Sequence, residues 1–238
     1  MLLAKQFIPL LIAAAINVNA QVDLGTALSF GVLGSSTVTN TGPTTIEGDV
    51  GVSPGTAITG FPPGIVTDGT THAGDAVAAQ AQSDALTAYN QAAGQSAGVD
   101  LTDQDLGDLR LTPGVYTFAS SAQLTGSLTL DAQGNTDSFW IFQIDSTLTT
   151  ATDSSVILVN GASSCNVFWQ VGSSATLGSG TAFSGNILAL ESITLVSEST
   201  VDVVVLFVES IVFFIFHNHI VNYDIIIVFF FHASIIFL

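Results

Sequence analysis

Short apolar segments alternate with turn-forming residues along most of this sequence. Between Gln21 and Asp202, brief runs rich in Val, Ile, Leu, Phe and Thr are separated by Gly, Ser, Asn and Asp. Short β-prone segments bounded by turn formers are typical of an all-β protein. The pattern therefore predicts many short strands for the body of the chain.

The strands recur in a fixed order, which narrows the architecture. An apolar strand is followed by a Ser/Thr-rich strand and then by a second apolar strand, in copies that cover 139–159, 167–183 and 186–201. Val38 and Ile58 occupy equivalent positions in two earlier copies. Three strand types reused in order predict a β-helix of triangular section, whereas a two-sheet sandwich explains the alternation but not the reuse.

One segment, residues 75–97, is rich in Ala and predicts a long α-helix. Its small residues fall at helical spacing in a stripe made of Val77, Ala81, Ala85, Ala88 and Ala92. A stripe of small residues lets a helix lie close to a flat sheet. We expect this helix to pack on the strands at 139–144 and 167–171, as core packing and not as a cofactor site.

Both ends of the chain differ from the body. Residues 1–20 contain Lys5, an apolar run and a small-residue end at Ala20, which predicts a signal peptide cleaved before Gln21 and a secreted, extracellular protein. Residues 203–238 are dominated by Val, Ile, Leu and Phe. Acidic residues interrupt this tail, so it makes a poor transmembrane span. We favour a gene-model artefact or frameshift, and a hydrophobic anchor is the alternative.

Composition excludes several classes of function. The chain carries 19 acidic and 2 basic residues, for a formal net charge of -17, and the mature part keeps Arg110 as its only basic residue apart from histidine. Nucleic acid is excluded as a partner because phosphate binding needs clustered Lys and Arg. A membrane is expected as a partner only if the tail is real. Cys165, the one cysteine, is expected to be a buried thiol.

Catalytic and cofactor motifs are absent from the sequence. His72 is the only histidine outside the tail, and nothing near it resembles a nucleophile elbow. Acidic residues cluster at 100–108 without the spacing of a calcium loop, and we expect a solvated acidic loop. His217 and His219 have no further ligand at metal-binding spacing. We therefore predict no catalytic residues, no metal, no small-molecule cofactor, and a protein that is not an enzyme.

The Ser/Thr-rich strands supply the candidate functional surface. With Leu148, Ala175 and Ile193 pointing inward, the alternate residues point outward. The predicted outward set is Thr37, Thr39, Ala57, Thr59, Thr147, Thr149, Ser174, Thr176, Ser192 and Thr194. This side would be flat, uncharged and stiff, because Thr is restricted at χ1. Such a surface suits a repeating, uncharged ligand such as ice or a polysaccharide, although Ser and Thr are also common at exposed strand positions.

Many blocks of the sequence, in order, resemble one known family. The blocks lie at 24–27, 30–34, 48–55, 59–64, 72–76, 111–116, 139–144, 166–177 and 183–189. Among them are Gly-Asp-Val-Gly-Val-Ser-Pro-Gly at 48–55 and Phe-Trp-Ile-Phe-Gln-Ile at 139–144. The chain resembles the secreted ice-binding (antifreeze) proteins of cold-adapted fungi, algae and bacteria, which have a discontinuous β-helix.

This resemblance implies a right-handed β-helix with an α-helix alongside, and adsorption to an ice crystal through one flat side, the b face. It also implies that the N-terminal coils pack beside the C-terminal ones. The resemblance ends at Asp202, after which the expected final coil is not recognisable. We predict a β-helix domain at 21–202 that inhibits ice growth or recrystallisation. The alternative is an extracellular adhesin or polysaccharide-binding protein on the same scaffold.

Overall fold

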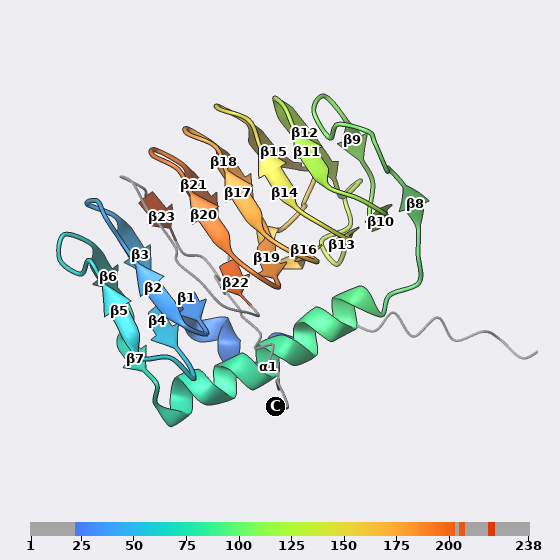
Figure 1. The fold of residues 1–238 in the computed structure, drawn as a ribbon. Helices are drawn as coiled ribbons and strands as arrows, with labels where there is room; N and C mark the ends of the chain where they lie inside the picture. The colour runs from blue at the N-terminus through green and yellow to red at the C-terminus, as the bar shows by residue number, and fades with distance from the viewer. Residues whose placement is uncertain (1–21, 203–204, 208–218, 222–238) are drawn as a thin grey trace, which may run out of the picture.

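The computed structural model describes residues 22–202, 205–207 and 219–221. The predicted signal sequence at 1–20 and most of the predicted tail at 203–238 lie outside these residues. The described strands are parallel and stack in coils around three sides (Figure 1). The predicted β-helix is therefore confirmed.

The first side, here called the a face, is the largest sheet. Within the described residues it has nine strands in the order β7 (Thr71–Ala73), β4 (Asp49–Val52), β1 (Phe30–Gly34), β22 (Val205–Phe207), β19 (Asn186–Ala189), β16 (Val167–Val171), β13 (Trp140–Ile144), β10 (Gly114–Phe118) and β8 (Val99–Asp100). Strands β1 and β4 from the N-terminal part thus follow β22 and β19 from the C-terminal part. The expected packing of N-terminal coils beside C-terminal ones is confirmed.

The c face is a second continuous sheet. Its eight described strands run β6 (Ile65–Thr67), β3 (Thr45–Glu47), β23 (His219–Val221), β21 (Thr200–Asp202), β18 (Ala182–Ser184), β15 (Ser155–Val159), β12 (Ser127–Asp131) and β9 (Arg110–Leu111). Strands β22 and β23 belong to these two faces although they lie beyond the boundary predicted at Asp202.

The b face consists of two smaller sheets. One pairs β2 (Thr37–Thr39) with β5 (Ala57–Thr59), and the other runs β11 (Ala122–Leu124), β14 (Leu148–Thr150), β17 (Ala175–Leu177) and β20 (Ile193–Leu195). Each complete coil passes from the a face to the b face and then to the c face, as in β13, β14 and β15. The predicted succession of strand types therefore corresponds to the three sides.

A column of aromatic side chains fills the centre of the coils. Tyr116, Phe142 and Trp169 occupy equivalent positions on β10, β13 and β16. The rings of Phe142 and Trp169 are parallel within 8° with centroids 3.9 Å apart, and Phe183 meets Trp169 at 5.0 Å. In-register coils place like residues above one another, so stacking contributes stability beyond the burial of apolar area.

Helix α1 (Ala76–Ala93) carries the chain from β7 at one end of the a face to β8 at the other (Figure 1). Eighteen residues of helix span roughly 27 Å, and nine strands span about 38 Å, so a helix with short connections covers the distance. Asp75 begins the helix as its N-cap and accepts a hydrogen bond from the Ala78 N–H at 2.9 Å. Gly94 ends the helix, before the predicted end at 97.

The buried stripe of α1 differs from the prediction at one position. Ala81, Ala85, Ala88 and Ala92 are fully buried as expected, but Ala78 takes the first place and Val77 is 48% exposed. Ala78 lies about 20° from Ala85 around the helix axis, whereas Val77 lies about 80° away. The prediction chose Val77 because its side chain is larger and apolar, but Ala78 is the residue that faces the sheet.

The helix packs on the a face at the predicted strands. Gln143 of β13 donates to the carbonyl oxygens of Ala92 at 2.8 Å and Gln95 at 3.0 Å, so it caps the C-terminal end of the helix. Gln170, its neighbour on β16, donates to the Tyr89 hydroxyl at 2.6 Å. Burial raises the pKa of Tyr89.

No helix among the described residues is both long and apolar enough to cross a bilayer.

Two short 3-10 helices complete the described elements: η1 (Gly25–Ser29) and η2 (Ser164–Asn166). Thr26 of η1 donates through its backbone and its hydroxyl to the Asp84 carboxylate, at 2.8 and 2.6 Å, which fixes η1 on α1. Cys165 lies on η2 and is half-buried, so the expectation of a buried thiol was wrong. The turn at η2 directs Cys165 away from the aromatic core.

Candidate functional site

The candidate surface is the b face, where outward side chains form two rows. The alternation of buried and accessible residues follows from the strand period of two, since Leu148, Ala175 and Ile193 are fully buried. The described residues give a first row of Ser121, Thr147, Ser174 and Ser192, and a second row of Gln123, Thr149, Thr176 and Thr194. Neither row contains a charged side chain.

Of the six predicted residues of the C-terminal coils, Thr149, Thr176 and Thr194 lie on one sheet, and the other three immediately precede its strands β14, β17 and β20. Thr176 pairs with Thr149 on one side and with Thr194 on the other. The four N-terminal residues lie on the smaller sheet, where Thr37 pairs with Ala57 and Thr39 with Thr59. The structure thus divides the predicted set between two sheets of one face.

Hydrogen bonds between neighbouring coils hold several of these hydroxyls in place. The Thr147 hydroxyl donates to that of Ser121 at 2.8 Å, and the Ser192 hydroxyl donates to that of Ser174 at 3.0 Å. The bond from Thr59 to Thr39 is longer, at 3.3 Å. The hydrogen bonds at Thr147 and Ser192 fix the orientation of hydroxyl groups in the first row before any ligand binds.

Thr37 contributes less than its position suggests. Its Oγ1 is buried and has no hydrogen-bond partner among the described residues. The Thr37 hydroxyl is therefore not presented to solvent. The hydroxyl of Ser35, two residues earlier, is likewise buried without a hydrogen-bond partner among the described residues.

The sequence-based prediction missed one strand of the face. Strand β11 brings Ser121 and Gln123 into the two rows, with Ala122 and Leu124 buried between and after them. The same alternation of small polar and apolar residues is present in the sequence at 121–124 and could have identified the strand. Gln123 is the only residue of the two rows with a long side chain.

Glu191 marks one rim of the face. It lies in the turn before β20, and its carboxylate accepts from the Ser173 hydroxyl at 2.9 Å and from the Ser174 hydroxyl at 3.5 Å. Glu191 is exposed and lies alongside the first row, in the turn that directly precedes Ser192. The uncharged area is thereby limited to the strands themselves.

The residues considered for catalysis have structural roles instead. His72 of β7 contacts the Asp75 carboxylate through Nδ1 at 2.8 Å and the Thr70 hydroxyl through Nε2 at 3.0 Å. The Ala78 backbone N–H and His72 both donate to Asp75 and lower its pKa. The ring therefore supports the helix N-cap.

The acidic cluster after the helix is exposed, as expected. Asp105 caps its loop by accepting from the backbone N–H groups of Gly107 at 2.7 Å and Thr125 at 2.9 Å. Partial burial raises the pKa of Asp105, but these hydrogen bonds outweigh burial and leave the pKa below its usual value. No group of three potential metal ligands exists in the described ranges.

Comparison with known proteins identifies the family that has this face. The model of the ice-binding-like family matches residues 32–214. The chain belongs to the ice-binding-like family. The match continues past Asp202, where the block-by-block resemblance ends, and so includes β22.

Named relatives of this ice-binding-like chain come from bacteria and fungi. An ice-binding protein of Nostoc sp. (strain HG1) is 60% identical over 179 residues, which is 75% of this chain and 66% of that protein. One from Leucosporidium sp. (strain AY30) is 36% identical, over 76% of each chain. The match thus spans just under two thirds of the Nostoc protein.

A solved structure shows the same fold. The crystal structure of an ice-binding protein from the Antarctic ascomycete Antarctomyces psychrotrophicus superposes with a TM-score of 0.76 and 39% identity, covering 84% of this chain and 97% of that one. The β-helix with its accompanying helix is therefore the common architecture of this family.

Proposed function

We propose that this protein binds ice through the b face and thereby inhibits ice growth or recrystallisation. The observation that carries the proposal is the pair of in-register, uncharged rows of short side chains centred on Thr149, Thr176 and Thr194. The names of the relatives support ice as the ligand.

The chemistry of the b face explains why ice is a suitable ligand. Equivalent residues repeat about every 4.8 Å between coils and about every 7 Å along a strand, which gives a fixed two-dimensional lattice of hydroxyl and methyl groups. Thr is stiff at χ1, so little side-chain entropy is lost on adsorption. Charged groups would hold their own hydration water and oppose a crystalline arrangement. The b-face rows contain none.

Adsorption requires neither catalysis nor a cofactor. We propose that the protein is not an enzyme, that residues 1–20 direct its secretion, and that the chain acts outside the cell. His72 is the one histidine outside the tail, and both of its ring nitrogens are hydrogen-bonded, which supports a structural role for this residue. N-terminal sequencing of exported protein tests cleavage before Gln21, and cell-retained protein with an intact Met1 would contradict secretion.

Bulky substitutions test the face directly. We expect T149Y and T176Y each to abolish ice-crystal shaping and thermal hysteresis, because one ring that stands above the rows prevents flat contact. T129Y on β12 is the matched control, since Thr129 points outward from the c face. Circular dichroism would confirm that all three variants fold. Retained hysteresis in T149Y and T176Y, or equal loss in T129Y, would contradict the assignment.

A further inference from the structure

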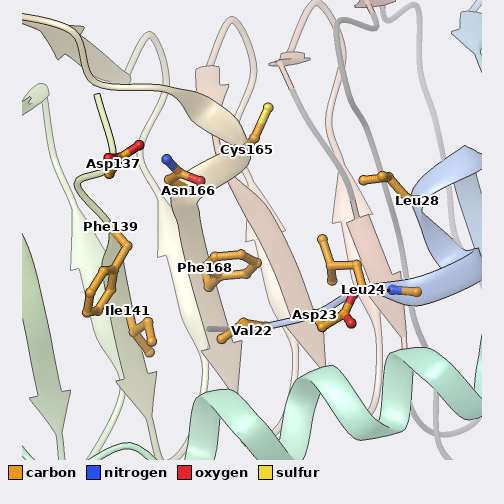
Figure 2. A pocket seen from close by; sticks show the side chains of 11 residues that line it. Val22, Asp23, Leu24, Leu28, Asp137, Phe139, Ile141, Cys165, Asn166 and Phe168 are labelled. Atoms are coloured by element: carbon orange, nitrogen blue, oxygen red, sulfur yellow. Dashed lines mark hydrogen bonds between the residues drawn. The ribbon is translucent and has the colours of Figure 1, made fainter. Parts of the chain in front are cut away.

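The a face contains a groove that the proposed ice-binding function does not use. Helix α1 covers only part of the outer surface of this sheet. Beyond the helix lies a pocket of about 500 Å³ between the N-terminal segment, the turn before β13 and the η2 turn (Figure 2). That volume is within the range of small-molecule sites.

Apolar residues form the floor and one wall of the groove. Phe139, Ile141 and Phe168 provide the floor, and Val22, Leu24 and Leu28 provide the wall. Leu28 is 51% exposed, so it offers apolar surface at the edge of the groove. The lining would therefore gain from an apolar occupant.

Two carboxylates give the groove a charge. Asp137 and Asp23 line it from different segments, and Phe168 lies between them in Figure 2. The Asp23 carboxylate accepts one hydrogen bond, from the Gly25 N–H at 3.0 Å. The Asp137 carboxylate accepts none from the part of the chain that the structure describes.

Among the described residues, no Arg or Lys side chain is available to neutralise these carboxylates. Arg110, the one Arg or Lys of the described residues, is bound to Asp131 at 2.7 Å on the c face. The formal net charge of -17 further favours cations over anions near the surface. Aromatic faces such as that of Phe168 also attract cations.

We propose that this groove binds a small organic cation with an apolar body, an alkyl or aryl ammonium compound, independently of ice. The apolar body lies on Phe139, Ile141 and Phe168, and the ammonium group is attracted by Asp23 and Asp137. The site is distinct from the b face, since it lies outside a different sheet.

Three probes with one alkyl chain and different head groups test the proposal. The full chain is titrated with n-decylammonium, n-decanol and n-decanoate below their micelle concentrations, and the methyl resonances of Leu28 and Ile141 are followed by NMR. We expect saturable binding of n-decylammonium, with n-decanoate weaker by about fivefold or more. Equal affinity for the three probes, preference for the anion, or no saturable shifts in the groove would overturn the proposal.

Matched variants separate the charge from the apolar surface. The double variant D23N/D137N should reduce the preference for the cation over n-decanol to within about twofold. The control D68N/D103N removes two exposed carboxylates elsewhere, at left-handed positions that Asn tolerates. It should retain the preference. An equal loss in both double variants would show that only net charge matters and would overturn the site.

A second pair tests the apolar wall. L28Q should weaken all three probes, whereas V77Q, at a position of similar exposure on α1, should not. Unchanged binding in L28Q would contradict the assigned wall.

Discussion

The b face and the c face are built from the same coils but present different surfaces. Both are parallel sheets with buried inward positions and in-register outward rows. On the b face the rows consist mainly of short, uncharged side chains and are centred on Thr149 and Thr176. On the c face, Arg110 with Asp131, Glu47 and Asp202 place charges among small residues. A regular parallel sheet therefore does not by itself define the candidate site, and the absence of charge distinguishes the b-face rows.

The c face also carries apolar bulk. Ile157 and Ile65 are exposed there, whereas neither b-face row contains a large apolar side chain. Side chains of unequal length interrupt a plane even when the backbone beneath it is regular. The two faces thus provide a comparison within one molecule, with a shared core and different side chains.

The largest expected effect comes from that shared core. Trp169 is fully buried, stacks on Phe142 and meets Phe183 at a tilt beneath both faces. We expect W169A to lower the free energy of unfolding by about 3–5 kcal/mol. Chemical denaturation measures this change. A loss below about 1 kcal/mol would show that the coils do not depend on the aromatic column.

The next effect concerns charge placed on the rows. We expect T176E, at the centre of the b face, to reduce thermal hysteresis by about fivefold or more, because the carboxylate holds its hydration water. T129E on the c face should change hysteresis by less than twofold. Both proteins should melt near the wild-type temperature. Equal losses in the two variants would remove the distinction between the faces.

A smaller effect, in the opposite direction, concerns the end of the second row. Gln123 occupies the position equivalent to Thr149 but is longer than its neighbours. We expect Q123T to raise hysteresis by up to about twofold by extending the flat row by one residue. The isosteric control Q133E changes an exposed turn residue and should have no effect. Lower hysteresis in Q123T would show that the Gln123 side chain itself belongs to the binding surface.

The smallest effect concerns pH. Hydrogen bonds hold the pKa of Asp105 below its usual value, and bonds from Asn160, Gln133 and Arg110 do the same for Asp131. A carboxyl with a lowered folded-state pKa stabilises the fold above its unfolded pKa, and this contribution is lost as the pH falls through the folded value. Thermal stability should therefore be constant near neutrality and decline below about pH 4.

The comparison of faces sharpens this last prediction. The two b-face rows have no titratable side chain, so hysteresis per folded molecule should not change between pH 5 and pH 8. D105N should reduce the acid sensitivity by lowering stability at neutral pH. A pH-dependent hysteresis in fully folded protein would contradict the assignment of ice binding to the uncharged rows.

Sequence alone was sufficient for the local features of this protein. The period of two placed Thr149, Thr176 and Thr194 outward, and the recurrence of strand types predicted three sides, because both depend on side chains near in the chain. Most of the alanine stripe followed from helical periodicity. The ten predicted surface residues all lie on the b face, although their role remains a proposal.

Other features depended on contacts between distant segments. The angular phase of α1, which buries Ala78 and exposes Val77, was set by the sheet beneath the helix. Strand β11 was missed although its alternation is present in the sequence at 121–124, because only its pairing with β14 shows that so short a segment extends the rows. The groove beside Phe168 exists only because the N-terminal segment and the η2 turn meet on a sheet that α1 leaves partly uncovered.

The division has one physical reason. Alternation and capping are governed by backbone geometry over a few residues, which a sequence displays directly. The stacking order of coils, the register of β22 between β19 and β1, and the placement of Asp23 and Asp137 around one groove arise from burial and pairing across the whole chain. Sequence determined which side chains point outward, and only the tertiary structure decided which of them share a surface.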